Sequence, residues 1–110
     1  MKPQQFDRLF HALADPHRRH MVEHLARGPA SVKKLAEPIE IALPSALKHL
    51  KVLEDGGIVL SEKTGRVRTY RIRPNALKSI SEWVKQRQTA IDKSFDRLAE
   101  AMSALPERDE

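Results

Sequence analysis

The sequence has no cysteine, only four glycines and few aromatic residues. Without cysteine, the chain can form no disulfide, Cys-ligated zinc site, iron–sulfur cluster or thiolate nucleophile. Its glycines are scattered rather than grouped in a phosphate-binding loop, which argues against a nucleotide-dependent enzyme. No apolar run approaches the roughly 20 residues of a membrane-spanning helix. We therefore expect a cytoplasmic protein with no membrane partner.

The 110 residues fit one domain, because domains usually hold about 100 to 150 residues. The net charge of +5 is concentrated in the middle of the chain. Residues 43–73 contain seven basic and three acidic side chains (+4), whereas residues 74–110 contain six and seven (−1). A local basic excess is typical of a phosphate-binding surface, but a solvated charged face has the same composition.

Apolar spacing predicts two helices in the first part of the chain. The second begins at Pro16, with Asp15 as its N-cap, and ends at residues 27–29, where Gly-Pro forbids continuation. The first ends near Asp15 and has one apolar face at the spacing i, i+3, i+4, i+7, formed by Phe6, Leu9, Phe10 and Leu13.

A helix-turn-helix is predicted over residues 31–57. Ser31 is a good N-cap for a short helix over residues 32–37, which Pro38 ends. The next helix stops at residues 55–57, Asp-Gly-Gly, and two short helices joined so closely form this motif. Its expected inward face consists of Leu43, Ala46, Leu50 and Leu53.

After Gly57 the apolar period changes from 3.6 to 2, which predicts a hairpin. Its strands would cover residues 58–62 and 66–72, around a turn at residues 63–65. Arg66, Arg68 and Tyr70 would then share one face of the second strand. A basic hairpin directly after a helix-turn-helix is a wing, here residues 58–73, and the pattern does not decide which strand face meets the core.

A last helix is predicted from Asn75, as N-cap, to Leu105, followed by a frayed acidic tail over residues 106–110. About 30 helical residues would span roughly 45 Å, longer than a compact domain of this size covers by itself. Its apolar residues recur every seven positions and form a stripe along the helix. Because the domain cannot cover the whole stripe, the uncovered part needs a partner. The fold class is therefore mainly α with a small β-hairpin, in the order four helices, two strands and one long helix.

The basic middle segment has the features of a DNA-binding surface. Opposite the buried face of the helix over residues 43–54 lie a hydroxyl and two lysines, which suit insertion in a major groove. Ser45 could bond a base edge or a phosphate, and Lys48 could reach the acceptors of guanine. Lys51 is better placed for a phosphate. A solvated charged face is the alternative for any single lysine. The candidate DNA-binding residues are Ser31, Pro44, Ser45, Leu47, Lys48, His49, Lys51, Lys63, Arg66 and Arg68.

Five segments together resemble the ArsR/SmtB family of winged-helix regulators: residues 13–19 (LADPHRR), 35–37 (LAE), 49–59 (HLKVLEDGGIV), 65–66 (GR) and 70–72 (YRI). The resemblance covers about residues 6–75. It implies a homodimeric repressor whose fourth helix binds operator DNA and which releases DNA on binding an effector. It also implies that the first and last helices form the dimer interface, here Phe6, Leu9, Phe10, Leu13, Leu77, Ile80, Trp83, Val84, Ile91, Phe95, Leu98 and Met102.

The chain departs from the family at the metal sites. It has no cysteine and no histidine beyond His49, so neither the Cys-x-Cys type of site nor the carboxylate and histidine set of the last helix can form. Many members also have serine where this chain has Leu47. Only His17, His20 and His24, at i, i+3 and i+7, remain as a metal cluster, and the adjacent arginines disfavour a dication. We expect no metal and no other cofactor.

Enzyme signatures are missing, because Ser31 and Ser45 have no nucleophile-elbow sequence around them. We predict a homodimeric, sequence-specific DNA-binding repressor that occludes promoter DNA, with no catalytic activity. Its operator would be palindromic, with half-sites roughly 10 bp or a multiple apart. Two alternatives are a winged-helix module that binds another protein, and a metal-responsive repressor using His17, His20 and His24. The sequence does not indicate the effector.

Overall fold

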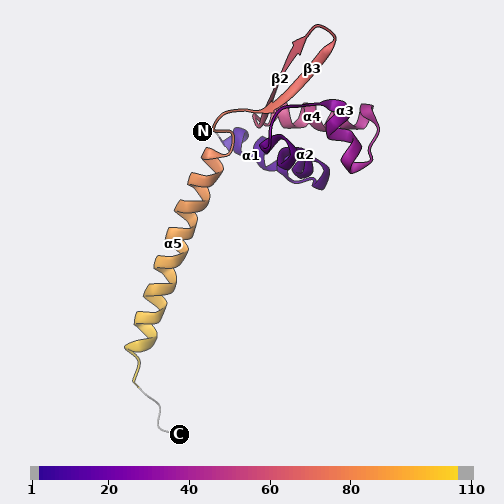
Figure 1. The fold of residues 1–110 in the computed structure, drawn as a ribbon. Coiled ribbons are helices and arrows are strands. Elements are labelled where there is room, and N and C mark those ends of the chain that lie inside the picture. Colours follow the sequence, from indigo (N-terminus) through magenta and orange to yellow (C-terminus); the bar gives the residue numbers. More distant parts are fainter. Residues whose placement is uncertain (1–2, 107–110) are drawn as a thin grey trace. The chain divides into compact units, whose positions relative to one another are not determined.

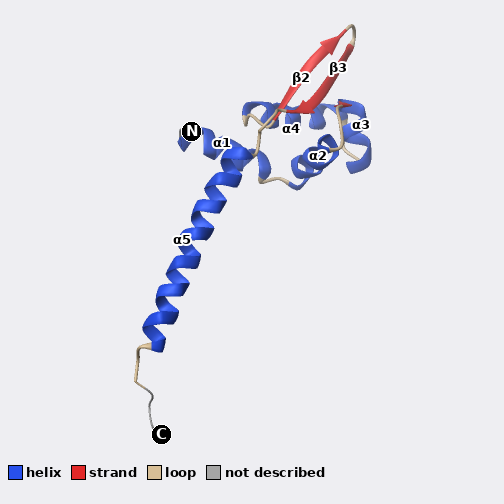
Figure 2. Ribbon diagram, turned by 60° about the vertical axis from the view of Figure 1, so that its left-hand side comes forward, coloured by secondary structure: helices blue, strands red, loops and turns tan. Residues whose placement is uncertain are grey.

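The computed structural model describes residues 3–106. The chain forms two compact units that divide between Leu77 and Lys78 (Figures 1 and 2). No helix within residues 3–106 combines the length and the hydropathy of a membrane-spanning segment. The first unit contains α1 (Pro3–Leu13), α2 (Pro16–Ala26), β1 (Ala30–Ser31), α3 (Val32–Ala36), the 3-10 helix η1 (Glu37–Ile39), α4 (Leu43–Asp55), β2 (Val59–Thr64) and β3 (Val67–Ile72), and the second contains α5 (Lys78–Ser103). The predicted fold class is confirmed.

The two first helices begin and end as their sequence predicts. Asp15 is extended, and its carboxylate accepts a hydrogen bond from the backbone N–H of Arg18 at 3.1 Å, which caps α2. Pro16 occupies the first turn of α2, where its missing N–H costs nothing. Leu9 and Ala12 of α1 are buried, and α1 packs on α2 and α4.

The helix-turn-helix consists of α3, η1 and α4. The Ser31 hydroxyl accepts from the backbone N–H of Lys34 at 3.4 Å, as a cap requires. The α-helix ends at Ala36, one residue earlier than predicted, and Pro38 lies in the first turn of the 3-10 helix η1 that follows. Glu40 then adopts a left-handed conformation (φ 54°) and redirects the chain toward α4.

The inward face of α4 is confirmed for Ala46, Leu50 and Leu53, each 0% exposed. Leu43, which we also predicted to face inward, is 47% exposed. Leu43 is the first residue of α4, and the buried stripe starts almost one turn later, so packing does not reach it. Around the α4 stripe, the core is completed by Met21, Leu25, Leu35, Ile58, Val59 and Tyr70.

The sheet has three antiparallel strands in the order β1-β3-β2. The pair Thr64↔Val67 closes the hairpin, so the turn consists of Gly65 and Arg66 rather than residues 63–65. Gly65 has φ 62°, which fits a two-residue turn with glycine at its first position. The hairpin extends well beyond the helices of its unit in both views (Figures 1 and 2). Tyr70 is buried, and this settles which face of β3 meets the core.

The second unit is the helix α5, which starts later than predicted. Asn75 is not its N-cap, because Asn75 lies in a turn with φ 59° and the helix begins at Lys78. Asparagine tolerates this left-handed conformation better than most residues do. The helix has no buried residue. Of the tail predicted to fray, residues 107–110 lie outside the described residues.

Candidate nucleic-acid interface

The N-terminal half of α4 presents the side chains that the sequence assigns to DNA. Pro44, Ser45, Leu47 and Lys48 are all exposed, with Leu47 at 46%. Among residues 3–106, Lys48 has no hydrogen-bond or ion-pair partner. Ala42, at the N-cap, offers no side-chain hydrogen bond, so the first N–H groups of α4 are not capped by it. These groups and the Lys48 ammonium suit a negatively charged ligand.

Lys51 lies one turn further along α4 and is already paired. Its ammonium is 3.1 Å from the Asp55 carboxylate, and both side chains are largely exposed. An exposed i, i+4 pair contributes little to stability. Lys51 can therefore leave Asp55 for a phosphate at small cost, but its net gain from a phosphate is lower than that of Lys48.

The wing carries three further predicted residues, placed differently from our expectation. Arg66 lies in the turn rather than on a strand, so it does not share a strand face with Arg68. Lys63 and Arg68 are direct cross-strand partners in β2 and β3. Arg68 donates a hydrogen bond to the Ser61 hydroxyl at 2.8 Å, which directs its guanidinium along the hairpin. Three cations thus surround the tip, and all three are exposed.

Two predicted DNA contacts are occupied within the protein. The hydroxyl of Ser31 caps α3 and is half-buried. His49 is also half-buried. Its Nδ1 lies 3.2 Å from the Arg18 guanidinium and 3.8 Å from the Asp15 carboxylate. The ring of His17 is 5.6 Å from that of His49. The structure therefore places His49 where it ties α4 to the start of α2.

Sequence reasoning missed the role of Arg18, which is the buried charge of this cluster at 9% exposure. Its Nε donates to the Ala12 carbonyl at 2.7 Å and its Nη2 to the His11 carbonyl at 2.9 Å. One guanidinium thus caps the C-terminal end of α1 while it contacts α4. A signal was available, because Arg18 stands at the core spacing i, i+3, i+7 with Met21 and Leu25.

The cluster also fixes the charge state of Asp15. Burial works to raise the pKa of this carboxyl, but the backbone N–H of Arg18 and the charges of His49 and Arg18 outweigh it. The net result is a pKa below the ordinary value of 3.8. Asp15 therefore stays ionised at neutral pH, where it caps α2 and faces both basic side chains.

The histidines at positions 17, 20 and 24 lie on one side of α2, as their spacing predicts. Glu23 lies beside one of them, with its carboxylate 4.0 Å from Nδ1 of His20. Within residues 3–106, no three His, Asp or Glu side chains are placed to share a metal ion. The geometry therefore lends no support to a metal-responsive repressor that uses these histidines.

The residues predicted to form a dimer interface differ in accessibility. Along α5, Val84, Ile91 and Leu98 recur every seven residues and are each about half exposed. Trp83, Phe95 and Met102 add to this stripe. Before it lie Ile80, which is half-buried, and Leu77, which is exposed. On α1, Phe10 is 42% exposed, its ring stacks on that of Phe6, and Leu13 is half-buried. Leu9 is 3% exposed and belongs to the core of its own chain, so it offers no free surface.

Comparisons with known proteins agree with this architecture. A helix-turn-helix domain family matches residues 13–62. The HTH-type transcriptional regulator Rv2034 of Mycobacterium tuberculosis is 39% identical over 99 residues, which cover 90% of this chain and 86% of the relative. The crystal structure of an ArsR family transcriptional regulator matches with a TM-score of 0.78 and 41% identity, over 84% of this chain and 95% of that one. The chain belongs to the ArsR family.

Membership of the ArsR family makes the chain a DNA-binding transcriptional regulator rather than an enzyme. Another solved structure, the homodimeric winged helix-turn-helix DNA-binding domain Mb0332 of Mycobacterium bovis, has a TM-score of 0.62 and 26% identity. That match covers 86% of this chain and 84% of the other. The resemblance inferred from the sequence is confirmed.

Proposed function

We propose that this ArsR family chain is a homodimeric repressor that binds a palindromic operator and occludes a promoter in the cytoplasm. In this proposal, residues 31–57 and the wing, 58–73, contact DNA, and residues 75–105 dimerise, so that residues 1–110 act as one domain. The observation that carries the proposal is the exposed Lys48, which has no partner among residues 3–106, at the start of α4, in the same unit as the cationic wing tip.

The individual roles follow from accessibility and chemistry. Ser45 and Lys48 contact base edges in the major groove, where lysine donates to guanine and a hydroxyl bonds either a base or a phosphate. Leu47 is exposed enough to touch a thymine methyl group. Lys51 and the wing cations contact phosphates, and such contacts position the protein without specifying sequence. His49 and Ser31 act indirectly, because they hold α4 and α3 in place.

Dimerisation supplies the two-fold symmetry that a palindrome requires. The support comes from the α5 stripe, whose large apolar side chains are too exposed for a monomer surface, and from the homodimeric relative of Mycobacterium bovis. We expect Phe95→Glu, at a position 64% exposed, to convert the dimer to a monomer of 12.5 kDa in sedimentation equilibrium at micromolar concentration. Thr89→Glu adds the same charge to the same helix on the side away from the stripe, and should remain dimeric. Equal masses for both variants would refute this interface.

Footprinting of the DNA upstream of the protein's own gene tests the repressor proposal. We expect two protected half-sites whose centres are about 10 bp, or a multiple, apart. Inserting 5 bp between the half-sites rotates one half-site by half a helical turn relative to the other and should abolish high-affinity binding. Inserting 10 bp returns both half-sites to the same face of the duplex. Affinity that is the same for operator and scrambled DNA would exclude sequence-specific binding and favour the protein-interaction alternative.

A further inference from the structure

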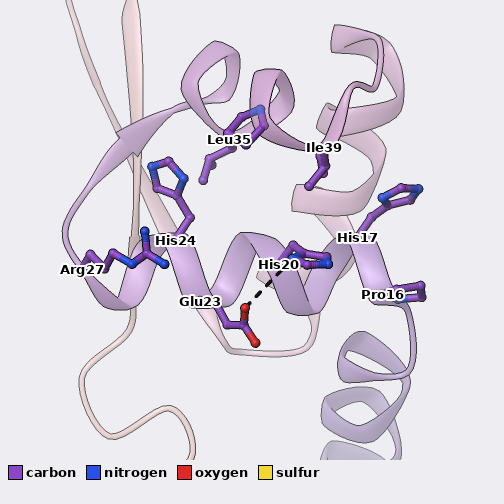
Figure 3. A pocket seen from close by; sticks show the side chains of 9 residues that line it. Pro16, His17, His20, Glu23, His24, Arg27, Leu35 and Ile39 are labelled. Atoms are coloured by element: carbon purple, nitrogen blue, oxygen red, sulfur yellow. Dashed lines mark ion pairs between the residues drawn. The ribbon is translucent and has the colours of Figure 1, made fainter.

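A pocket of about 400 Å³ lies between α2 and the α3–η1 segment, outside the residues proposed to bind DNA (Figure 3). Its α2 wall is polar, with His17, His20 and His24 followed by Arg27 at the spacing i, i+3, i+7, i+10. The rings of His24 and His17 project toward the side where Leu35 and Ile39 lie, and the ring of His20 lies between them along the helix (Figure 3). The pocket therefore has one polar wall and one apolar wall.

The polar stripe of α2 borders a neighbouring segment, α3–η1, rather than open solvent alone. The face of a helix that closes against a neighbour usually carries apolar residues. On α2 the buried apolar residues are Met21 and Leu25 instead, which lie on another side of the helix. The histidine side is not closed by apolar packing. Opposite it, Leu35 is buried in the core, and the apolar side chains of that wall that remain accessible are Pro38 and Ile39. Apolar surface with a few polar groups is the usual composition of a small-molecule site.

The charges in the pocket favour an anion. Glu23 is the one acidic side chain lining it, and its carboxylate already faces His20 at 4.0 Å. Within residues 3–106, the Arg27 guanidinium has no hydrogen-bond or ion-pair partner. The half-buried His24 lies one turn before Arg27 on the same side of α2. Arg27 and His24 therefore remain as donors for a carboxylate.

We propose that this pocket binds a small organic acid with a ring body. The carboxylate accepts hydrogen bonds from Arg27 and His24, and the ring packs on Pro38 and Ile39, the apolar residues of the α3–η1 wall that are not buried. The volume of about 400 Å³ lies within the range of roughly 300 to 1,000 Å³ typical of ligand pockets. The histidines serve as hydrogen-bond donors to the ligand rather than as metal ligands.

Two connections couple the pocket to α4. The η1 wall continues through residues 40–42 into the start of α4. On the other wall, His17 contacts His49 of α4, with ring centres 5.6 Å apart. A ligand that fixes α2 against η1 therefore biases the position of α4 and changes the affinity for DNA. By linkage, bound DNA changes the affinity for the ligand by the same factor. This coupling rests on the proposed function, whereas binding of the acid does not.

The test uses 1-naphthoate as the probe and the full-length protein without DNA. Histidine ring signals in NMR spectra should shift saturably for His20 and His24, and not for His11, which lies on α1 outside the pocket. Arg27→Gln should weaken binding about tenfold, because a charge-assisted hydrogen bond is lost. Arg19→Gln removes the same charge from α2 outside the pocket and should leave the affinity unchanged. The neutral amide, 1-naphthamide, should bind at least about tenfold more weakly than the acid.

Three results would overturn the proposal: no saturable shift, equal affinity for acid and amide, or equal affinity of Arg27→Gln and Arg19→Gln. Zinc ions alone that saturate the His20 and His24 signals, where naphthoate does not, would replace the acid site with a metal site. A second arm measures operator affinity with and without naphthoate. An unchanged affinity refutes only the coupling, and a protein that binds no DNA at all refutes the proposed function while the NMR result stands separately.

Discussion

Arg18 joins three helices through one buried side chain, and replacing it should be costly. Its guanidinium donates to two carbonyls at the end of α1, at 2.7 and 2.9 Å, and contacts His49 of α4 at 3.2 Å. A hydrogen bond from a charged group contributes about 1.5 to 3 kcal/mol. Two such bonds at the lower value predict that Arg18→Ala lowers the free energy of unfolding by about 3 kcal/mol. For a chain of this size the melting temperature would fall by roughly 10 to 20 °C.

Arg19 provides the matched control. It also donates to a carbonyl at the end of α1, that of Leu13 at 2.9 Å, but through a single exposed bond. Arg19→Ala should therefore cost about 0.5 kcal/mol or less. Arg18→Lys keeps the charge but loses the forked guanidinium that reaches two carbonyls. Its loss of free energy of unfolding should therefore lie between those of Arg18→Ala and Arg19→Ala.

Urea unfolding followed by circular dichroism measures these differences. One protein concentration is used throughout, because the stability of a dimer depends on concentration. Losses for Arg18→Ala and Arg19→Ala that agree within about 0.5 kcal/mol would refute the argument that burial and multiple hydrogen bonds make Arg18 the junction of the three helices.

Two further changes test packing and electrostatics in the same unit. A Cβ at Gly56 would lie 2.8 Å from the Ala12 Cβ and 3.1 Å from the Arg8 carbonyl oxygen, so Gly56→Ala should lower the free energy of unfolding by about 1 to 3 kcal/mol in urea titrations. Ala12→Gly in the same chain should recover part of this loss, and no recovery would exclude the clash. Because the pKa of Asp15 is lowered, its ionised form contributes stability above pH 3.8 that is lost as the pH falls below that value. Asp15→Asn should flatten that acid limb of the stability profile, and an unchanged limb would remove Asp15 as its source.

Local signals were sufficient where a residue satisfies a local requirement. The caps at Asp15 and Ser31 form because their side-chain oxygens meet backbone N–H groups three residues later. The inward face of α4 followed from spacing alone, since Leu50 and Leu53 must be buried together. For the same reason the helix-turn-helix and the wing were placed correctly within a few residues.

Tertiary contacts decided the features that the sequence did not reveal. The strand β1 is only two residues long, too short for an alternation, and exists because β3 offers Ala30 and Ser31 a partner. The hairpin turn moved to Gly65 and Arg66 because cross-strand pairing continues to Thr64. For the candidate site, exposure of Lys48 was predictable, but the inward position of His49 depends on a partner 31 residues away.

The salt dependence of operator affinity tests the central claim most directly. Lys51→Ala and Arg66→Ala each remove one exposed cation assigned to a phosphate, from α4 and from the wing turn respectively. Lys93→Ala removes the same charge from an exposed position on α5, so it changes the net charge equally away from the proposed DNA surface. If α4 and the wing bind DNA, the slope of log K against log salt becomes shallower by about one for each of the first two variants and stays unchanged for Lys93→Ala. Slopes that are the same for the wild type and all three variants would contradict the proposed interface.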